Sequence, residues 1–128
     1  MRNSSTVNSI CFVGNYVPRQ CGIATFTTDL TESVAAESPA TSCFTIAMND
    51  TSEGYDYPER VRMSIRDDST EEYDLAAEFL NVHHTDIVCV QHEYGIYGPN
   101  SGERILDLMR QLSMPVVSTL HTVLDEPD

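Results

Sequence analysis

The sequence predicts an α/β fold in which one parallel sheet is covered by helices on both faces. Three observations predict it. Short, uniformly apolar runs recur along the chain, as in strands that are buried on both faces. Segments with apolar residues at helical spacing separate most of these runs. The length of 128 residues suits one compact domain with a single core.

The first unit is expected to be a strand, a loop and a helix. Residues 9–13 form an apolar run, which predicts a buried strand. Residues 14–22 contain glycine and proline and predict the loop. The helix that follows is expected to bury four residues at helical spacing, namely Ile23, Phe26, Leu30 and Val34.

The later elements follow the same alternation. Strands are predicted at residues 43–48, 61–65, 87–90 and 115–120, and helices from Thr70 to about His84 and at residues 103–112. Apolar residues alternate with arginines in the third strand, so we expect it at an edge of the sheet. Right-handed crossovers then give the strand order 3-2-1-4-5. We therefore expect a Rossmann-like three-layer sandwich over residues 9–128, preceded by a flexible terminus at residues 1–8.

The charge of the chain is strongly negative. Twenty Asp and Glu residues stand against seven Arg and no Lys, which gives a formal net charge of −13. Such a surface repels nucleic acid and anionic lipid. No apolar run is long enough to cross a membrane, and no secretory signal precedes the first strand. We therefore expect a cytoplasmic protein without a nucleic-acid partner.

The cysteine pattern favours reduced structural thiols. Three of the four cysteines lie in or beside apolar runs, where a thiol packs as a small hydrophobe. The nearest two, Cys11 and Cys21, are too far apart in sequence for a zinc-binding pair. Cys89 lies within a strand three residues before His92, which places the two side chains on opposite faces. No metal and no cofactor is expected.

Candidate ligand-binding residues follow three strands of the predicted sheet. Ligands bind open parallel sheets at the carboxyl ends of the strands, where the winding direction reverses. Gly22 starts a helix whose unpaired N–H groups suit a phosphate or a sugar hydroxyl, although it could instead cap the helix or let it pack closely. His92 and Glu93 come directly after the fourth strand, and His121 follows the fifth. We expect both histidines to face one crevice.

Three motifs resemble a known family. They are Pro18-Arg19-Gln20-Cys21-Gly22-Ile23-Ala24-Thr25-Phe26, Gln91-His92-Glu93-Tyr94-Gly95-Ile96-Tyr97-Gly98 and Thr119-Leu120-His121-Thr122. From about Ile10 to its end, the chain resembles the amino-terminal domain of family 4 glycosyltransferases. That resemblance implies the GT-B architecture of two Rossmann-like domains and a retaining reaction without a metal. It also implies that a carboxyl-terminal, donor-binding domain would be needed.

The resemblance implies roles for individual residues. The helix start, with Arg19, Gly22, Ile23 and Ala24, would approach the donor phosphates or the acceptor. His121 would contact the transferred sugar as the catalytic residue. The acceptor side would be lined by His92, Glu93, Tyr94 and Gly95.

The partners implied are a nucleotide-diphosphate sugar as donor and a carbohydrate or lipid as acceptor, with a hexose as the transferred group. Departure of a nucleoside diphosphate requires positive charge, and Arg19 is the one arginine in the matched loops. The chain is therefore expected to be inactive alone. Two alternatives are a stand-alone flavodoxin-like binding module and an interaction module that forms a homodimer through the exposed cleft face.

Overall fold

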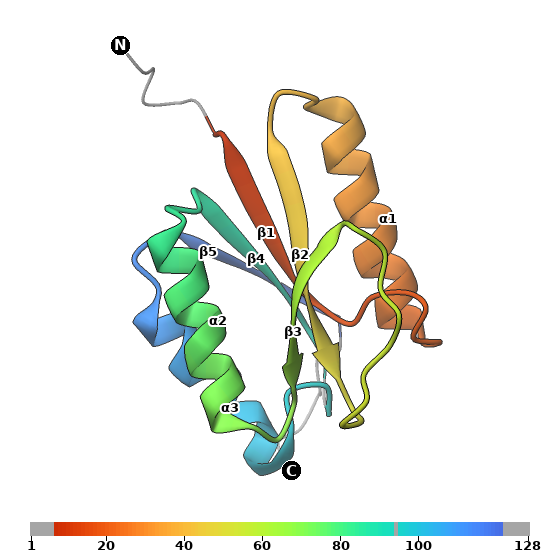
Figure 1. Cartoon of the computed structure of the whole chain (residues 1–128), viewed down its shortest axis with the longest axis vertical. Helices are drawn as coiled ribbons and strands as arrows, with labels where there is room; N and C mark the ends of the chain where they lie inside the picture. Colours follow the sequence, from red (N-terminus) through yellow and green to blue (C-terminus); the bar gives the residue numbers. More distant parts are fainter. Residues whose placement is uncertain (1–6, 94, 122–128) are drawn as a thin grey trace.

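The computed structural model describes residues 7–93 and 95–121. It forms a five-stranded sheet with the order β3-β2-β1-β4-β5, in which every pair of neighbouring strands is parallel (Figure 1). Three helices cover the sheet. The predicted Rossmann-like α/β sandwich and its strand order are thus confirmed.

The elements alternate along the chain as expected. The strands are β1 (Ser9–Gly14), β2 (Ser42–Asn49), β3 (Val61–Arg66), β4 (Ile87–His92) and β5 (Val116–Leu120). The helices are α1 (Gly22–Glu37), α2 (Thr70–Val82) and α3 (Pro99–Gln111). β3 lies at one edge of the sheet, as its alternating pattern predicted, and β5 lies at the other.

Neighbouring residues of β2 show that helices lie on both faces of the sheet. The hydroxyl of Thr45 lies 3.2 Å from that of Thr31 in α1. The ring of Phe44 packs edge-on against Phe79 of α2, with centroids 6.1 Å apart. Because successive strand residues point to opposite faces, α1 and α2 are on opposite sides. The main apolar core lies on the α2 side and includes Ile46, Met48, Val88, Val90, Leu80 and Leu108.

The buried side of α1 differs from the predicted one. Thr27 and Thr31 are fully buried, whereas Phe26 is 44% exposed. Each threonine hydroxyl donates to the carbonyl one turn earlier, at 2.8 Å, so no polar group is left unsatisfied by burial. Of the four predicted residues, Ile23 is buried, whereas Leu30 and Val34 are only half-buried. Apolar periodicity therefore identified only part of the buried side, because paired threonines can also line a helix–sheet contact.

Several boundaries also differ from the predictions. β4 continues through Gln91 to His92, and α3 begins at Pro99, before the predicted residue 103. Gln91 fits the strand because its side chain finds a half-buried partner, His121, at the sheet end. α2 ends at Val82, before the predicted end near His84, and His84 is exposed with a φ of 53°.

The predicted terminus and domain together extend beyond the described residues at both ends. Residues 1–6 and 122–128 lie outside the described part. Asn8, which we assigned to a flexible terminus, donates its N–H to Asp86 Oδ2 at 2.8 Å, and the Val7 carbonyl accepts from the Thr41 hydroxyl at 3.1 Å. The hydrogen-bonded chain thus starts by Val7, earlier than expected. No helix among the described residues is long and apolar enough to span a membrane.

Candidate functional site

The candidate site lies at the carboxyl ends of β1, β4 and β5, at the lower end of the molecule in Figure 1. We call residues 14–22, 91–93 and 121 the carboxyl rim. The His121 N–H donates to the His92 carbonyl at 2.9 Å, which joins the segments after β4 and β5. The His121 ring also packs edge-on against Phe26, with centroids 4.5 Å apart. Since Phe26 lies about one turn after Gly22, the start of α1 belongs to the same rim.

Gln91 holds the His121 side chain. Nε2 of His121 lies 2.9 Å from Oε1 of Gln91, and Gln91 is fully buried. In the register of the sheet Gln91 is opposite Thr119, so both point to the same face. His121 lies two residues beyond Thr119 and its side chain returns to that face, which is the α1 side.

Gly14 makes room for Gln91. A Cβ atom at residue 14 would lie 3.0 Å from the Thr27 hydroxyl and 3.2 Å from Cβ of Gln91. A side chain here would therefore press on both α1 and Gln91. The Gln91 backbone is held as well, because its carbonyl accepts from the Tyr97 hydroxyl at 2.6 Å.

The His92 side chain points away from His121, contrary to the expected shared crevice. His92 directly follows Gln91 in β4, so its side chain points to the opposite face. Its ring stacks on Tyr97, with centroids 5.9 Å apart and an angle of 27° between the planes. The two histidines thus share a rim and a backbone hydrogen bond, but their rings lie on different faces.

The start of α1 is open in front of Gly22. Cys21 is the N-cap, and no side chain caps the helix. A Cβ atom at Gly22 would meet nothing within 4 Å, so close packing on the sheet does not require this glycine. Ile23 and Ala24 bury their side chains in the core, which leaves only their backbone N–H groups for a ligand. This end of the helix suits an anion or a sugar hydroxyl.

Arg19 binds within the protein. Its Nη1 donates to Asn15 Oδ1 at 2.9 Å and to the Met48 carbonyl at 3.0 Å, and its Nη2 lies 3.6 Å from Asp50 Oδ2. Its side chain is only 14% exposed. These contacts tie the loop after β1 to the end of β2. Arg19 therefore supports the rim structurally, whereas the sequence suggested substrate binding.

The loop after β4 contains the remaining predicted residues. Glu93 is half-buried and directly follows the strand. Gly95 is exposed and has a φ of 89°, a conformation that favours glycine. Tyr94 lies outside the described residues.

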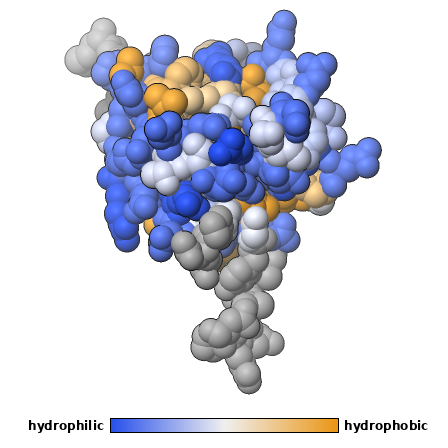
Figure 2. Space-filling view, turned by 60° about the horizontal axis from the view of Figure 1, so that its bottom comes forward, coloured by the Kyte–Doolittle hydropathy of each residue, from blue (hydrophilic) through white to orange (hydrophobic). Residues whose placement is uncertain are grey.

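Asp50 directly follows β2 and lies beside Arg19 of the rim. The Tyr55 hydroxyl donates to Asp50 at 2.6 Å and holds the pKa of that carboxyl below its usual value, with Arg19 adding to the effect. Burial raises the pKa of Tyr57 to about 12. Figure 2 turns this end of the molecule toward the reader, and most of the surface in view is hydrophilic. No group of three metal-ligating side chains occurs within the part of the chain that the structure describes.

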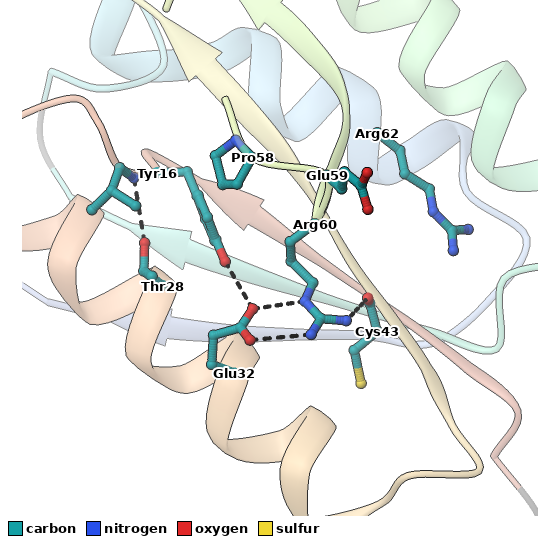
Figure 3. A pocket seen from close by; sticks show the side chains of 9 residues that line it. Tyr16, Thr28, Glu32, Cys43, Pro58, Glu59, Arg60 and Arg62 are labelled. Carbon is teal, nitrogen blue, oxygen red and sulfur yellow. Dashed lines mark hydrogen bonds and ion pairs between the residues drawn. The ribbon is translucent and has the colours of Figure 1, made fainter. Parts of the chain in front are cut away.

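A hollow of about 620 Å³ lies between α1 and the segment leading into β3, and Tyr16 and Val17 of the rim form part of its lining (Figure 3). Its most prominent contact is the ion pair of Arg60 and Glu32, in which both carboxylate oxygens are bound, at 2.7 and 3.1 Å. Arg60 also donates to the Cys43 carbonyl, and Tyr16 donates to Glu32. None of the predicted site residues lines this hollow.

Sequence reasoning missed Gln91 as a site residue. Gln91 opens the motif that contains His92 and Glu93, but we ended the predicted strand at Val90, where the apolar run stops. A polar residue between an apolar strand and a histidine was the available signal. Its partner His121 lies 30 residues later, so the pairing depends on the β4–β5 register.

Comparison of the chain with protein-family models, curated proteins and solved structures gave no match. A function is therefore inferred from the geometry of the rim together with the motif resemblance.

Proposed function

We propose that this chain forms the amino-terminal, acceptor-side half of a retaining glycosyltransferase. The enzyme would move a hexose from a nucleotide-diphosphate sugar to a carbohydrate or lipid acceptor. One observation carries the proposal: the His121 ring packs against Phe26 in the first turns of α1, so it lies near the uncapped start of that helix. Ligands of open parallel sheets bind in this region.

The two groups supply complementary binding chemistry. The free N–H groups of the first turn of α1 can donate to phosphate or sugar oxygens, and the helix dipole favours negative charge there. The His121 imidazole can exchange hydrogen bonds with sugar hydroxyls. The open space in front of Gly22 lets a ligand approach the backbone closely.

The rim also explains why a second half would be needed. A leaving diphosphate requires cationic or other hydrogen-bond donors near its oxygens. Arg19, the one arginine of the rim, is already bound to Asn15, Met48 and Asp50. A facing domain would have to bring further positive charge and enclose the donor. The chain alone should therefore bind donors weakly and show no turnover.

The test is transfer of labelled hexose from a panel of nucleotide sugars by the longest product of the reading frame. We expect transfer with one donor class, and His121→Ala should lower kcat far more than it changes KM. Exposed Glu37→Gln is the matched control and should leave both unchanged. Absence of transfer with every donor and acceptor, or unchanged kinetics in His121→Ala, would contradict the proposal.

A further inference from the structure

We propose that Gln91 is a positioning residue that holds His121 with its proton on Nε2 and leaves Nδ1 to accept a hydrogen bond from a sugar hydroxyl. The inference rests on the proposed function for the identity of the ligand. The hydrogen bond between the two side chains stands on the structure alone. Gln91 was not among the site residues that the sequence predicted.

The first observation behind the proposal is the contact between the side chains of Gln91 and His121. Oε1 of Gln91 lies 2.9 Å from Nε2 of His121. A carboxamide oxygen only accepts hydrogen bonds, so the ring nitrogen facing it must carry the proton. In a neutral imidazole the other nitrogen, Nδ1, then has the free lone pair. No other hydrogen bond to the His121 ring is present among the described residues.

The second observation is that Gln91 is itself held in place, as a positioning residue must be. Gln91 is fully buried, its Cβ lies against the space left by Gly14, and its carbonyl accepts from Tyr97. Its Nε2 is buried without a hydrogen-bond partner among the described residues. The contact with His121 is thus the only hydrogen bond that its amide makes there. Orientation of the amide and the position of the His121 proton are therefore coupled.

The third observation is that the His121 ring is held in one orientation. Phe26 packs edge-on against the imidazole, and the His121 N–H is fixed on the His92 carbonyl. Backbone, ring plane and proton are each held by a different neighbour. A preorganised acceptor of this kind loses little freedom when a substrate hydroxyl binds.

Nuclear magnetic resonance of the chain labelled with ¹⁵N in its histidines tests the positioning directly. We expect a protected Nε2–H signal for His121. Gln91→Met, which has a similar volume and no acceptor, should lose this signal because the proton then exchanges with water. Gln91→Glu restores the acceptor and should keep it. A wild-type proton on Nδ1, or an Nε2–H signal that survives in Gln91→Met, would overturn the proposal.

Kinetics of the longest product of the reading frame test the consequence. Gln91→Met should lower kcat/KM by about a hundredfold, the size of effect that a misplaced site group produces, and Gln91→Glu should recover part of the loss. Circular dichroism of Gln91→Met shows whether the variant is folded. A protected Nε2–H signal without any transfer in the wild type would contradict the proposed function but leave the positioning intact. Transfer that Gln91→Met leaves unchanged would overturn the positioning role.

Discussion

Gln91, the last residue but one of β4, and His121, which directly follows β5, meet through their side chains at 2.9 Å on the α1 face of the sheet. The contact depends on the parallel register of β4 and β5, in which Gln91 is opposite Thr119. A shift of one residue would turn either side chain to the other face. The fold therefore contributes to the site through strand register as well as through loop position.

Gly14→Ala should disturb this pair. The new Cβ would lie 3.0 Å from the Thr27 hydroxyl and 3.2 Å from Cβ of Gln91. Crowding of this kind costs about 1–3 kcal/mol of unfolding free energy. Urea denaturation measures the cost, and the protected Nε2–H signal of His121 should weaken because Gln91 is displaced.

Gly22→Ala is the matched control for Gly14→Ala. Nothing lies within 4 Å of a Cβ at this position, and the residue is the first of a helix. The substitution should stabilise the chain by about 0.4–1 kcal/mol, because alanine has less freedom in the unfolded state. The His121 signal should be unchanged. Equal losses of stability in the two variants would contradict the packing described for Gly14.

The fold was predictable because its main signals are local. Residues 9–13, 43–48 and 87–90 are apolar except for Ser9 and Thr45, and such runs fit strands that are buried on both faces. Handedness of the crossovers then limits the strand order. The inner side of α1 was not predictable in this way. Thr27 and Thr31 become compatible with burial only when their hydroxyls bond within the helix and to Thr45.

The candidate site was predictable in its location but not in its contacts. The rule for parallel sheets places the segments with Gly22, His92 and His121 at one rim. Which face each ring takes depends on where β4 ends, and the strand continues two residues beyond the apolar run. The binding of Arg19 to the Met48 carbonyl depends on tertiary structure, which periodicity does not contain.

Thr31 and Thr45 should show coupled effects on stability. The Thr31 hydroxyl donates to the Thr27 carbonyl, so the Thr45 hydroxyl is the donor across the 3.2 Å contact with Thr31. Thr31→Val removes the acceptor and should cost about 1–3 kcal/mol, because a buried hydroxyl is left unsatisfied. The double variant with Thr45→Val should lose less than the sum of the two single variants. Additive losses in urea denaturation would argue against the contact.

Gly98→Ala should destabilise the chain more than Gly95→Ala. Both glycines have positive φ, 80° and 89°, where an L-residue costs about 1–3 kcal/mol. A Cβ at Gly98 would also clash with the Asp67 carbonyl oxygen, whereas one at Gly95 would meet nothing within 4 Å. Thermal unfolding compares the two variants. Equal melting temperatures would contradict the close approach of Gly98 to Asp67.

The ion pair of Glu32 and Arg60 should make stability depend on pH in the acidic range. The Arg60 hydrogen bond holds the pKa of Glu32 below its ordinary value of 4.5. A carboxyl whose pKa is lower in the folded state stabilises above its unfolded pKa, and this contribution is lost as the pH falls through the folded value. Both side chains are partly exposed, so the contribution is at most about 1 kcal/mol. Glu32→Gln should therefore be less stable than the wild type at neutral pH, and the difference should shrink below pH 4.5.

Glu37→Gln provides the reference for Glu32→Gln. Glu37 is exposed at the end of α1 and makes no ion pair among the described residues. The difference in unfolding free energy between Glu37→Gln and the wild type should stay small at each pH. A stability difference in Glu32→Gln that grows as the solution is acidified would reverse the expected sign and contradict the assignment.

Arg19→Met should separate support of the rim from binding of a substrate. The variant removes the hydrogen bonds to Asn15 and to the Met48 carbonyl, together with the ion pair to Asp50. Loss of a hydrogen bond from a charged donor costs about 1.5–3 kcal/mol. Arg110→Met, at a side chain that is 75% exposed, should change stability by less than about 0.5 kcal/mol. If Arg19 instead serves mainly a substrate, Arg19→Met should unfold like the wild type and lose only transfer activity, because its contacts with the neighbouring loops would then carry little free energy.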